Sequence, residues 1–85
     1  MSKFILVTGA GTGIGRSIAE TLSNQGYDLI LCGRNLNRLE ETKTNLKNPS
    51  NHSTHSCDIR KAGNVQSILK KHNVESLYGL VANAG

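Results

Sequence analysis

Aromatic residues, proline and cysteine are scarce in this chain of 85 residues, which has 4% aromatics, one proline and two cysteines. Cys32 and Cys57 are too few and too far apart for a disulfide framework or a zinc site, which rely on closely spaced pairs. His52 and His55 lie near each other without an adjacent cysteine or carboxylate, which favours a polar loop over a metal site. The sequence therefore predicts no resident metal.

Long apolar runs and charge concentrated in one place are also missing. The apolar run after Lys3 is shorter than the roughly 7–15 residues of a signal-peptide core, and no run approaches the roughly 18 apolar residues of a membrane span. The net charge is +4, but the basic residues are scattered from Lys3 to Lys71 with few aromatics among them, which disfavours nucleic-acid binding. We therefore expect a cytoplasmic protein whose partners include neither nucleic acid nor a membrane.

Short apolar runs alternate with segments in which apolar residues recur at helical spacing. The runs predict strands at residues 3–8, 28–32, 53–57 and 77–82. The segments between them predict helices at residues 13–25, at residues 35–48, and around Val65, Ile68 and Leu69. Because strands joined by crossover helices run parallel, the pattern predicts an α/β fold with a doubly wound parallel sheet over residues 1–85.

The second helix and the third strand depend on different signals. Asn35 is expected to cap the helix, which directs Leu36, Leu39 and Leu46 toward the sheet and ends at Asn48-Pro49. The third strand contains little that is apolar and is placed mainly by its position between two helices.

A glycine-rich segment, TGAGTGIG at residues 8–15, lies where the first strand meets the first helix. Glycine there permits a tight turn, close approach of the backbone to a pyrophosphate, and close packing of helix on strand. Free N–H groups at the helix N-terminus favour bound phosphate. No lysine follows in the arrangement of a P-loop, and Ile14 and Arg16 occupy the places where the usual dinucleotide fingerprint requires its last glycine.

The spacing of Thr8-Gly9, three residues, then Gly13-Ile14-Gly15 resembles the glycine motif of the short-chain dehydrogenase/reductase family. Thr12 stands where the extended branch of that family has glycine, so the chain is similar to the common single-domain branch. The resemblance implies the N-terminal half of a Rossmann-type fold and a bound dinucleotide, NAD(P)(H). In this segment it implies cofactor contacts at Gly9, Gly11, Thr12, Gly13, Ile14 and Gly15.

Arg34 follows the second strand, where family members that prefer NAD carry an acidic residue. Its guanidinium can grip a 2′-phosphate bidentately, and no carboxylate repels that group. This favours NADP(H). NAD(H) stays open as the alternative, because many relatives that use NADP have a basic residue where this chain has Thr12.

Two later segments also match family landmarks. Asp58-Ile59 resembles the pair that contacts the adenine, although Asp58 is also a good helix N-cap. Asn83-Ala84-Gly85 resembles the end of the family element Asn-Asn-Ala-Gly, which lines the cofactor, with Ala82 in place of the first Asn. The resemblance thus assigns Asp58, Ile59, Asn83, Ala84 and Gly85 to the cofactor site.

No catalytic residue is expected in this chain. The family uses a Tyr with a Lys four residues later, but Leu31 follows Tyr27 and Ala82 follows Tyr78 at that spacing. We expect residues 1–85 to be a partial NAD(P)-binding domain, truncated before the catalytic region of an oxidoreductase and inactive alone.

The full-length parent would interconvert a carbonyl and an alcohol of a small-molecule substrate by hydride transfer, and a homo-oligomer is compatible with it. A nucleotide-binding sensor or regulatory protein without catalysis, or an inactive fragment, is the alternative. The fourth strand is expected to form an exposed apolar edge with Leu77, Leu80 and Val81, which predicts self-association or poor solubility of the 85-residue chain.

Overall fold

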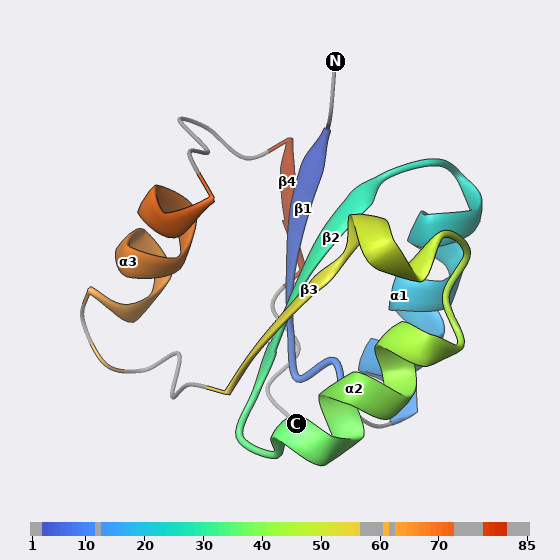
Figure 1. Cartoon of the computed structure of the whole chain (residues 1–85), viewed down its shortest axis with the longest axis horizontal. Helices are drawn as coiled ribbons and strands as arrows, with labels where there is room; N and C mark the ends of the chain where they lie inside the picture. The colour runs from blue at the N-terminus through green and yellow to red at the C-terminus, as the bar shows by residue number, and fades with distance from the viewer. Residues whose placement is uncertain (1–2, 12, 57–60, 62, 73–77, 82–85) are drawn as a thin grey trace.

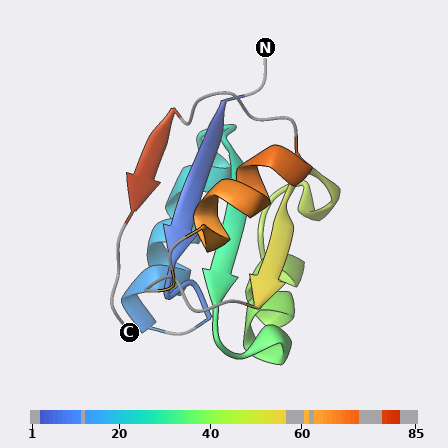
Figure 2. The same ribbon diagram turned by 90° about the vertical axis from the view of Figure 1, so that its left-hand side faces the viewer.

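The computed structural model describes residues 3–11, 13–56, 61, 63–72 and 78–81. Its strands form one parallel sheet in the order β3-β2-β1-β4, as a doubly wound fold requires. The strands are β1 (Phe4–Thr8), β2 (Asp28–Gly33), β3 (Ser53–Ser56) and β4 (Gly79–Val81). The helices are α1 (Gly13–Asn24), α2 (Leu36–Thr44) and α3 (Asn64–Lys71), with a 3-10 turn, η1, at Pro49–Asn51. Figure 2 shows the strand arrows pointing the same way.

Helices cover both faces of the sheet, with α1 and α2 on one side and α3 on the other (Figure 1). Successive strand side chains point to opposite faces, so each central strand contributes to two clusters. The cluster under α1 and α2 includes Ile5, Val7, Leu29, Leu31, Leu39 and Leu46. The cluster under α3 includes Leu6, Ile30, Cys32 and Ile68, with Leu69 packed against it. The continuous apolarity of β1 and β2 follows from this burial on both faces.

The face of α1 that packs on the sheet carries small residues rather than its largest apolar ones. Gly15, Ala19 and Ser23 are buried, whereas the side chain of Ile14 is 71% exposed. Small side chains let the helix axis come close to the strands, which moves the bulkier apolar residues to the flank of the helix. Ile18 and Leu22 are partly buried, and Leu22 packs against the core cluster on this side of the sheet.

The second helix ends earlier than the sequence predicted. Its last residue is Thr44, and Asn45 caps its C-terminus. Leu46 is buried as expected, but from the turn after the helix, and Asn48 has a left-handed backbone with a φ of 53° before Pro49 begins η1. The expectation for Leu36 was wrong, because its side chain at the first residue of the helix is 46% exposed.

The third strand is present despite its polar sequence, and its register pairs Ile30 with Ser53 and Cys32 with His55. The expected polar loop around His52 and His55 was wrong. His52 is buried, and its Nδ1 accepts a hydrogen bond from the backbone N–H of Leu29 at 3.0 Å. His55 lies within β3. These contacts attach a polar segment to the edge of β2.

The outer parts of two predicted strands fall outside the described ranges, namely Cys57 at the end of the third and Leu77 and Ala82 around the fourth. Within β4, Leu80 is 61% exposed at the edge of the sheet, as the sequence predicted, but Val81 is partly buried and packs against the cluster under α1 and α2. Among the residues with a described position, no helix has the length and apolarity to cross a membrane.

Candidate functional site

The glycine-rich turn lies at the carboxyl edge of the sheet, between the end of β1 and the start of α1. In open parallel sheets this edge is where ligands bind. Gly9 has a φ of 63° and Gly13 a φ of 56°, which is the left-handed conformation that side chains disfavour. The turn therefore needs glycine at both positions for its backbone path.

The later glycines of the turn have different surroundings. Apart from its chain neighbours and the backbone of its own helix, no atom of the described residues lies within 4 Å of the place where a Cβ of Gly13 would stand, so the turn is open to that part of the chain. A Cβ on Gly11 would lie 3.1 Å from the Cβ of Arg38, so Gly11 lets the turn rest directly on α2. Gly15 is buried, and the side chain of Ile14 is exposed. An open glycine turn before a helix N-terminus suits the pyrophosphate of a dinucleotide.

Side chains from both neighbouring helices hold the turn in place. The Arg16 guanidinium donates through Nη2 to the carbonyl oxygen of Gly11 at 2.7 Å and through Nε to Thr42 Oγ1 at 2.9 Å. The Thr42 hydroxyl lies 2.9 Å from the carbonyl oxygen of Ala10. The Ala10 N–H donates to the carbonyl of Cys32 in β2 at 3.2 Å. The turn is thus bound to α1, α2 and β2 together.

Arg34 directly follows β2, the strand that neighbours β1 at the same edge of the sheet. Its side chain is exposed, and its backbone carbonyl accepts a hydrogen bond from Ser56 Oγ at 3.1 Å. Asn35 then caps α2 through its side-chain oxygen, as predicted. In the described part of the chain the Arg34 guanidinium forms no ion pair. Its charge is therefore available to an anionic group at this edge.

The remaining predicted cofactor contacts lie outside the described residues. These are Thr12, Asp58, Ile59, Asn83, Ala84 and Gly85. The strand that leads to the last three ends beside β1, because Thr8 Oγ1 donates to the carbonyl oxygen of Val81 at 3.3 Å.

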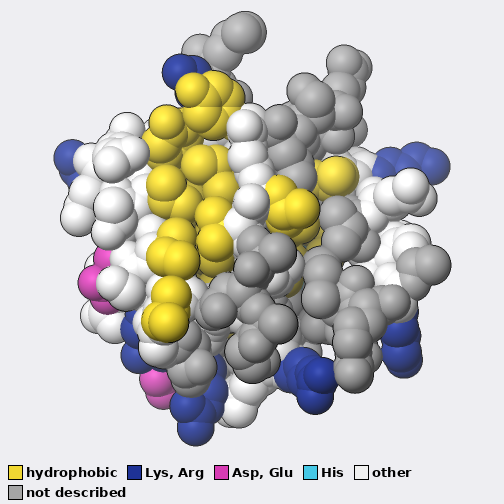
Figure 3. All heavy atoms as spheres, turned by 180° about the vertical axis from the view of Figure 1, so that it is seen from behind, with side chains coloured by type: hydrophobic (Ala, Val, Ile, Leu, Met, Phe, Trp, Pro, Cys, Tyr) yellow, Lys and Arg dark blue, Asp and Glu magenta, His cyan; other side chains and the backbone are white. Residues whose placement is uncertain are grey.

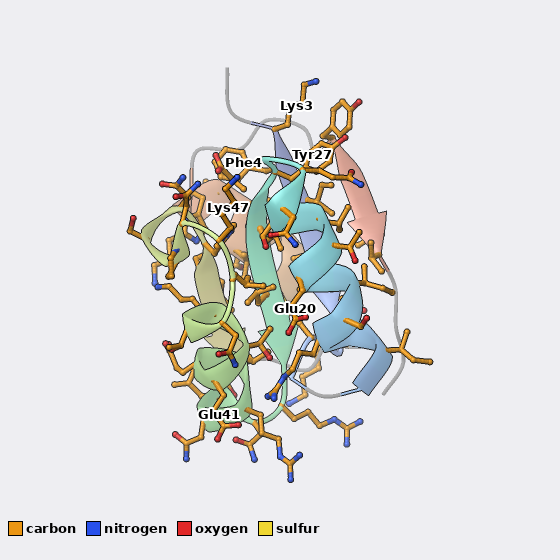
Figure 4. The ribbon with its side chains drawn as sticks, turned by 90° about the vertical axis from the view of Figure 1, so that its right-hand side faces the viewer. Lys3, Phe4, Glu20, Tyr27, Glu41 and Lys47 are labelled. Carbon is orange, nitrogen blue, oxygen red and sulfur yellow. The ribbon has the colours of Figure 1, made fainter. Side chains whose placement is uncertain are left out.

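The two tyrosines lie at the opposite edge of the sheet. Tyr27 immediately precedes β2 and Tyr78 immediately precedes β4, and their ring centroids are 5.3 Å apart. Figure 4 shows Tyr27 near Lys3 and Phe4 at one end of the molecule, with Glu41 at the other. Hydrogen bonding to Tyr78, then its charge and burial, raise the pKa of Tyr27 above its ordinary value. Such a shift is opposite to the one a tyrosine general base requires.

Comparison with known proteins identifies the family. A profile of the short chain dehydrogenase family matches residues 3–85. The chain belongs to this family. Sulfoacetaldehyde reductase 2 of Chromohalobacter salexigens is 36% identical over 87 residues, which cover 100% of this chain and 34% of the reductase.

Solved structures of dehydrogenases and oxidoreductases share the fold. Apo glucose dehydrogenase of Caenorhabditis elegans matches 98% of this chain and 38% of its own, with a TM-score of 0.85 and 29% identity. A metagenomic short-chain oxidoreductase in complex with NADP matches 100% of this chain and 40% of its own, with a TM-score of 0.78 and 27% identity. This short-chain dehydrogenase sequence spans about a third of the length of the curated relatives it matches.

Two residues that hold the glycine-rich turn of the candidate site, Arg16 and Thr42, were not predicted from the sequence. A signal for Thr42 was present, because it continues the helical spacing of the buried residues Leu39 and Leu46. A hydroxyl on the buried face of a helix needs a hydrogen-bond partner. That the partners are Ala10 and Arg16 depends on the tertiary fold. In the described ranges, no three His, Cys, Asp or Glu side chains gather as a metal site would require.

Proposed function

We propose that this chain is the cofactor-binding part of an oxidoreductase that interconverts a carbonyl and an alcohol. The open turn at Gly13 carries the proposal, because a glycine there leaves the helix N-terminus accessible to a pyrophosphate. Family membership and the reductases among the relatives support the same reaction class. When bound, the nicotinamide of the dinucleotide supplies or accepts the hydride.

Four segments of this chain would contact different parts of the dinucleotide. The turn at residues 9–15 would hold the pyrophosphate through backbone N–H groups, and Arg34 would hold the adenosine end. The family resemblance of the sequence assigns the adenine contact to Asp58-Ile59. It assigns the lining of the cofactor site to Asn83-Ala84-Gly85. Because both tyrosines lie at the other edge of the sheet, the proton of the alcohol is assigned to a group outside these 85 residues.

We propose NADP(H) as the preferred cofactor. The exposed guanidinium of Arg34 lies where a 2′-phosphate is expected, and a relative of the same fold has been crystallised with NADP. A planar guanidinium can form two parallel hydrogen bonds with a phosphate.

Calorimetric titration of the chain with NADPH and NADH tests both assignments. We expect tighter binding of NADPH, and Arg34→Ala should weaken NADPH by about tenfold or more while it changes NADH little. Lys47→Ala is the matched control, since it removes one positive charge at the far end of the α2 region (Figure 4). Tighter NADH binding, or NADPH binding that Arg34→Ala leaves unchanged, would contradict the 2′-phosphate assignment.

A further inference from the structure

Arg16 has more acceptors around it than a surface arginine usually finds. Besides Gly11 and Thr42, its Nη2 lies 3.2 Å from the carbonyl oxygen of Arg38 and 3.4 Å from Glu41 Oε2. Nη2 has two protons and three oxygens in range, those of Gly11, Arg38 and Glu41. The hydrogen bond to the Gly11 carbonyl is the shortest, at 2.7 Å, and is therefore the strongest of the three. The Glu41 carboxylate is largely exposed and its ion pair is long, so it contributes little. The main contacts of Arg16 are therefore its hydrogen bonds to Gly11 in the turn and to Thr42 in α2.

Thr42 completes the connection from the other side. Its hydroxyl accepts from Arg16 Nε and has one proton to donate, with the carbonyl oxygens of Ala10 at 2.9 Å and Arg38 at 3.1 Å in range. The carbonyl oxygen of Arg38 already accepts a hydrogen bond from Arg16, so the Thr42 hydroxyl donates to the carbonyl oxygen of Ala10. Thr42 is fully buried. Two successive carbonyls of the turn, those of Ala10 and Gly11, thus accept hydrogen bonds from side chains of α2 and α1.

Gly11 brings the backbone of the turn onto α2 at the same place. The position of its missing Cβ is 3.1 Å from the Cβ of Arg38, which lies in the first turn of the helix. Arg34 precedes that helix by two residues and is linked to it through the cap at Asn35. A contact that fixes the turn on α2 therefore also fixes the turn relative to Arg34.

We propose that Arg16 and Thr42 are positioning residues that lock the glycine-rich turn to α2, and so preset the spacing between the pyrophosphate and 2′-phosphate subsites of NADP(H). This inference rests on the proposed function. A turn rich in glycine loses much conformational entropy when it is ordered. Because the hydrogen bonds from Arg16 and Thr42 order the turn before the cofactor binds, this entropic cost does not reduce the affinity for the cofactor. The effect falls on ligands that span both subsites and not on a ligand that reaches only one.

Two ligands, one that spans both subsites and one that reaches only the 2′-phosphate subsite, test whether Arg16 and Thr42 set the spacing between them. NADPH spans the turn and Arg34, whereas 2′-AMP carries only the adenosine and its 2′-phosphate. We expect Arg16→Gln to weaken NADPH about tenfold, as loss of a charge-assisted hydrogen bond does, and to leave 2′-AMP unchanged. Arg16→Lys should behave like Arg16→Gln, because an ammonium cannot reach Gly11 and Thr42 as a fork. Thr42→Val, which removes the hydroxyl at nearly constant volume, should give the same pattern.

Amide hydrogen exchange gives a readout that needs no cofactor. The Ala10 amide is bonded to the Cys32 carbonyl, and we expect it to exchange about tenfold faster in Arg16→Gln and Thr42→Val. The Leu31 amide in the central strand β2 should be unchanged and reports that the variants are folded. Lys43→Gln on α2 is the control for loss of one positive charge, and it should alter neither the Ala10 exchange rate nor the NADPH affinity.

Unchanged exchange at Ala10 in both variants would overturn the lock, whatever happens to NADPH. Equal weakening of NADPH and 2′-AMP would overturn the positioning role, since a general loosening of the fold would produce it. If the unmodified chain binds neither ligand, the proposed cofactor function fails instead, and the exchange rates still decide whether Arg16 and Thr42 hold the turn.

Discussion

His52 fills both of its hydrogen-bonding positions with backbone groups. Nδ1 accepts from the Leu29 N–H at 3.0 Å, which leaves Nε2 as the donor to the Lys47 carbonyl at 2.8 Å. We expect His52→Ala to lower the free energy of unfolding by about 1–3 kcal/mol, because it leaves a buried N–H without a partner. Chemical denaturation measures this loss.

His52→Asn is the matched variant, since its side-chain oxygen stands near the place of Nδ1 and can still accept from Leu29. It should lose clearly less stability than His52→Ala. Equal losses in the two variants would show that the bond to Leu29 is not what stabilises this position.

Residues whose role depends on local backbone could be predicted from the sequence, and residues whose role depends on a distant partner could not. The positive φ values of Gly9, Gly13 and Gly26 follow from the turns and helix end that the glycines mark. Arg16 and Thr42 lie 26 positions apart, and only the packing of α1 beside α2 brings them together. The turn was therefore predictable, but the side chains that hold it were not.

At the scale of elements, a pair of histidines joins β3 to the end of α3. The Nε2 atoms of His55 and His72 lie 2.8 Å apart, with the rings edge to face, so one imidazole donates and the other accepts as a neutral ring. Burial, followed by the charges of His72 and Lys71, lowers the pKa of His55 below its ordinary value. Protonation of His55 therefore opposes the contact between β3 and α3.

This pair predicts a loss of stability in acid. Below about pH 6.5 the unfolded chain takes up a proton at His55 before the folded chain does, so the free energy of unfolding falls as the pH drops through that window. Urea denaturation at pH 7.5 and at pH 5.0 measures the loss. His55→Gln, which keeps a polar side chain but does not titrate, should flatten this dependence. An identical acid loss in the variant would contradict the assignment to His55.

The helix and strand pattern was predictable because apolar spacing and glycines mark it, whereas two features depended on tertiary contacts. Helix α2 ends at Thr44 rather than at the proline, since the chain turns early and still buries Leu46. Strand β3 has little apolar content of its own and forms against the edge of β2.

At the scale of the whole molecule, apolar side chains gather on one face, seen in Figure 3. The exposed large hydrophobic side chains include Tyr78 and Leu80, at and just before the edge strand β4, and Ile14 on α1. An uncovered parallel edge with apolar side chains favours pairing with another chain. We expect the 85-residue chain to self-associate as its concentration rises, which sedimentation velocity would detect.

Leu80→Lys should shift that equilibrium toward the monomer, because a charge on an edge strand opposes pairing. Leu36→Lys is the control, since Leu36 is also exposed but lies on α2. A monomer at high concentration in the unmodified chain, or an equal effect of both variants, would argue against association through β4.

The most direct test of the cofactor site is a titration of the isotope-labelled chain with NADP⁺, followed through its backbone amide resonances. We predict shifts at Gly9, Gly13, Gly15 and Arg34, at the carboxyl edge of the sheet, and none at Tyr27 or Tyr78 at the opposite edge. Shifts centred on the tyrosines, or an unmoved glycine-rich turn at saturating NADP⁺, would contradict the account.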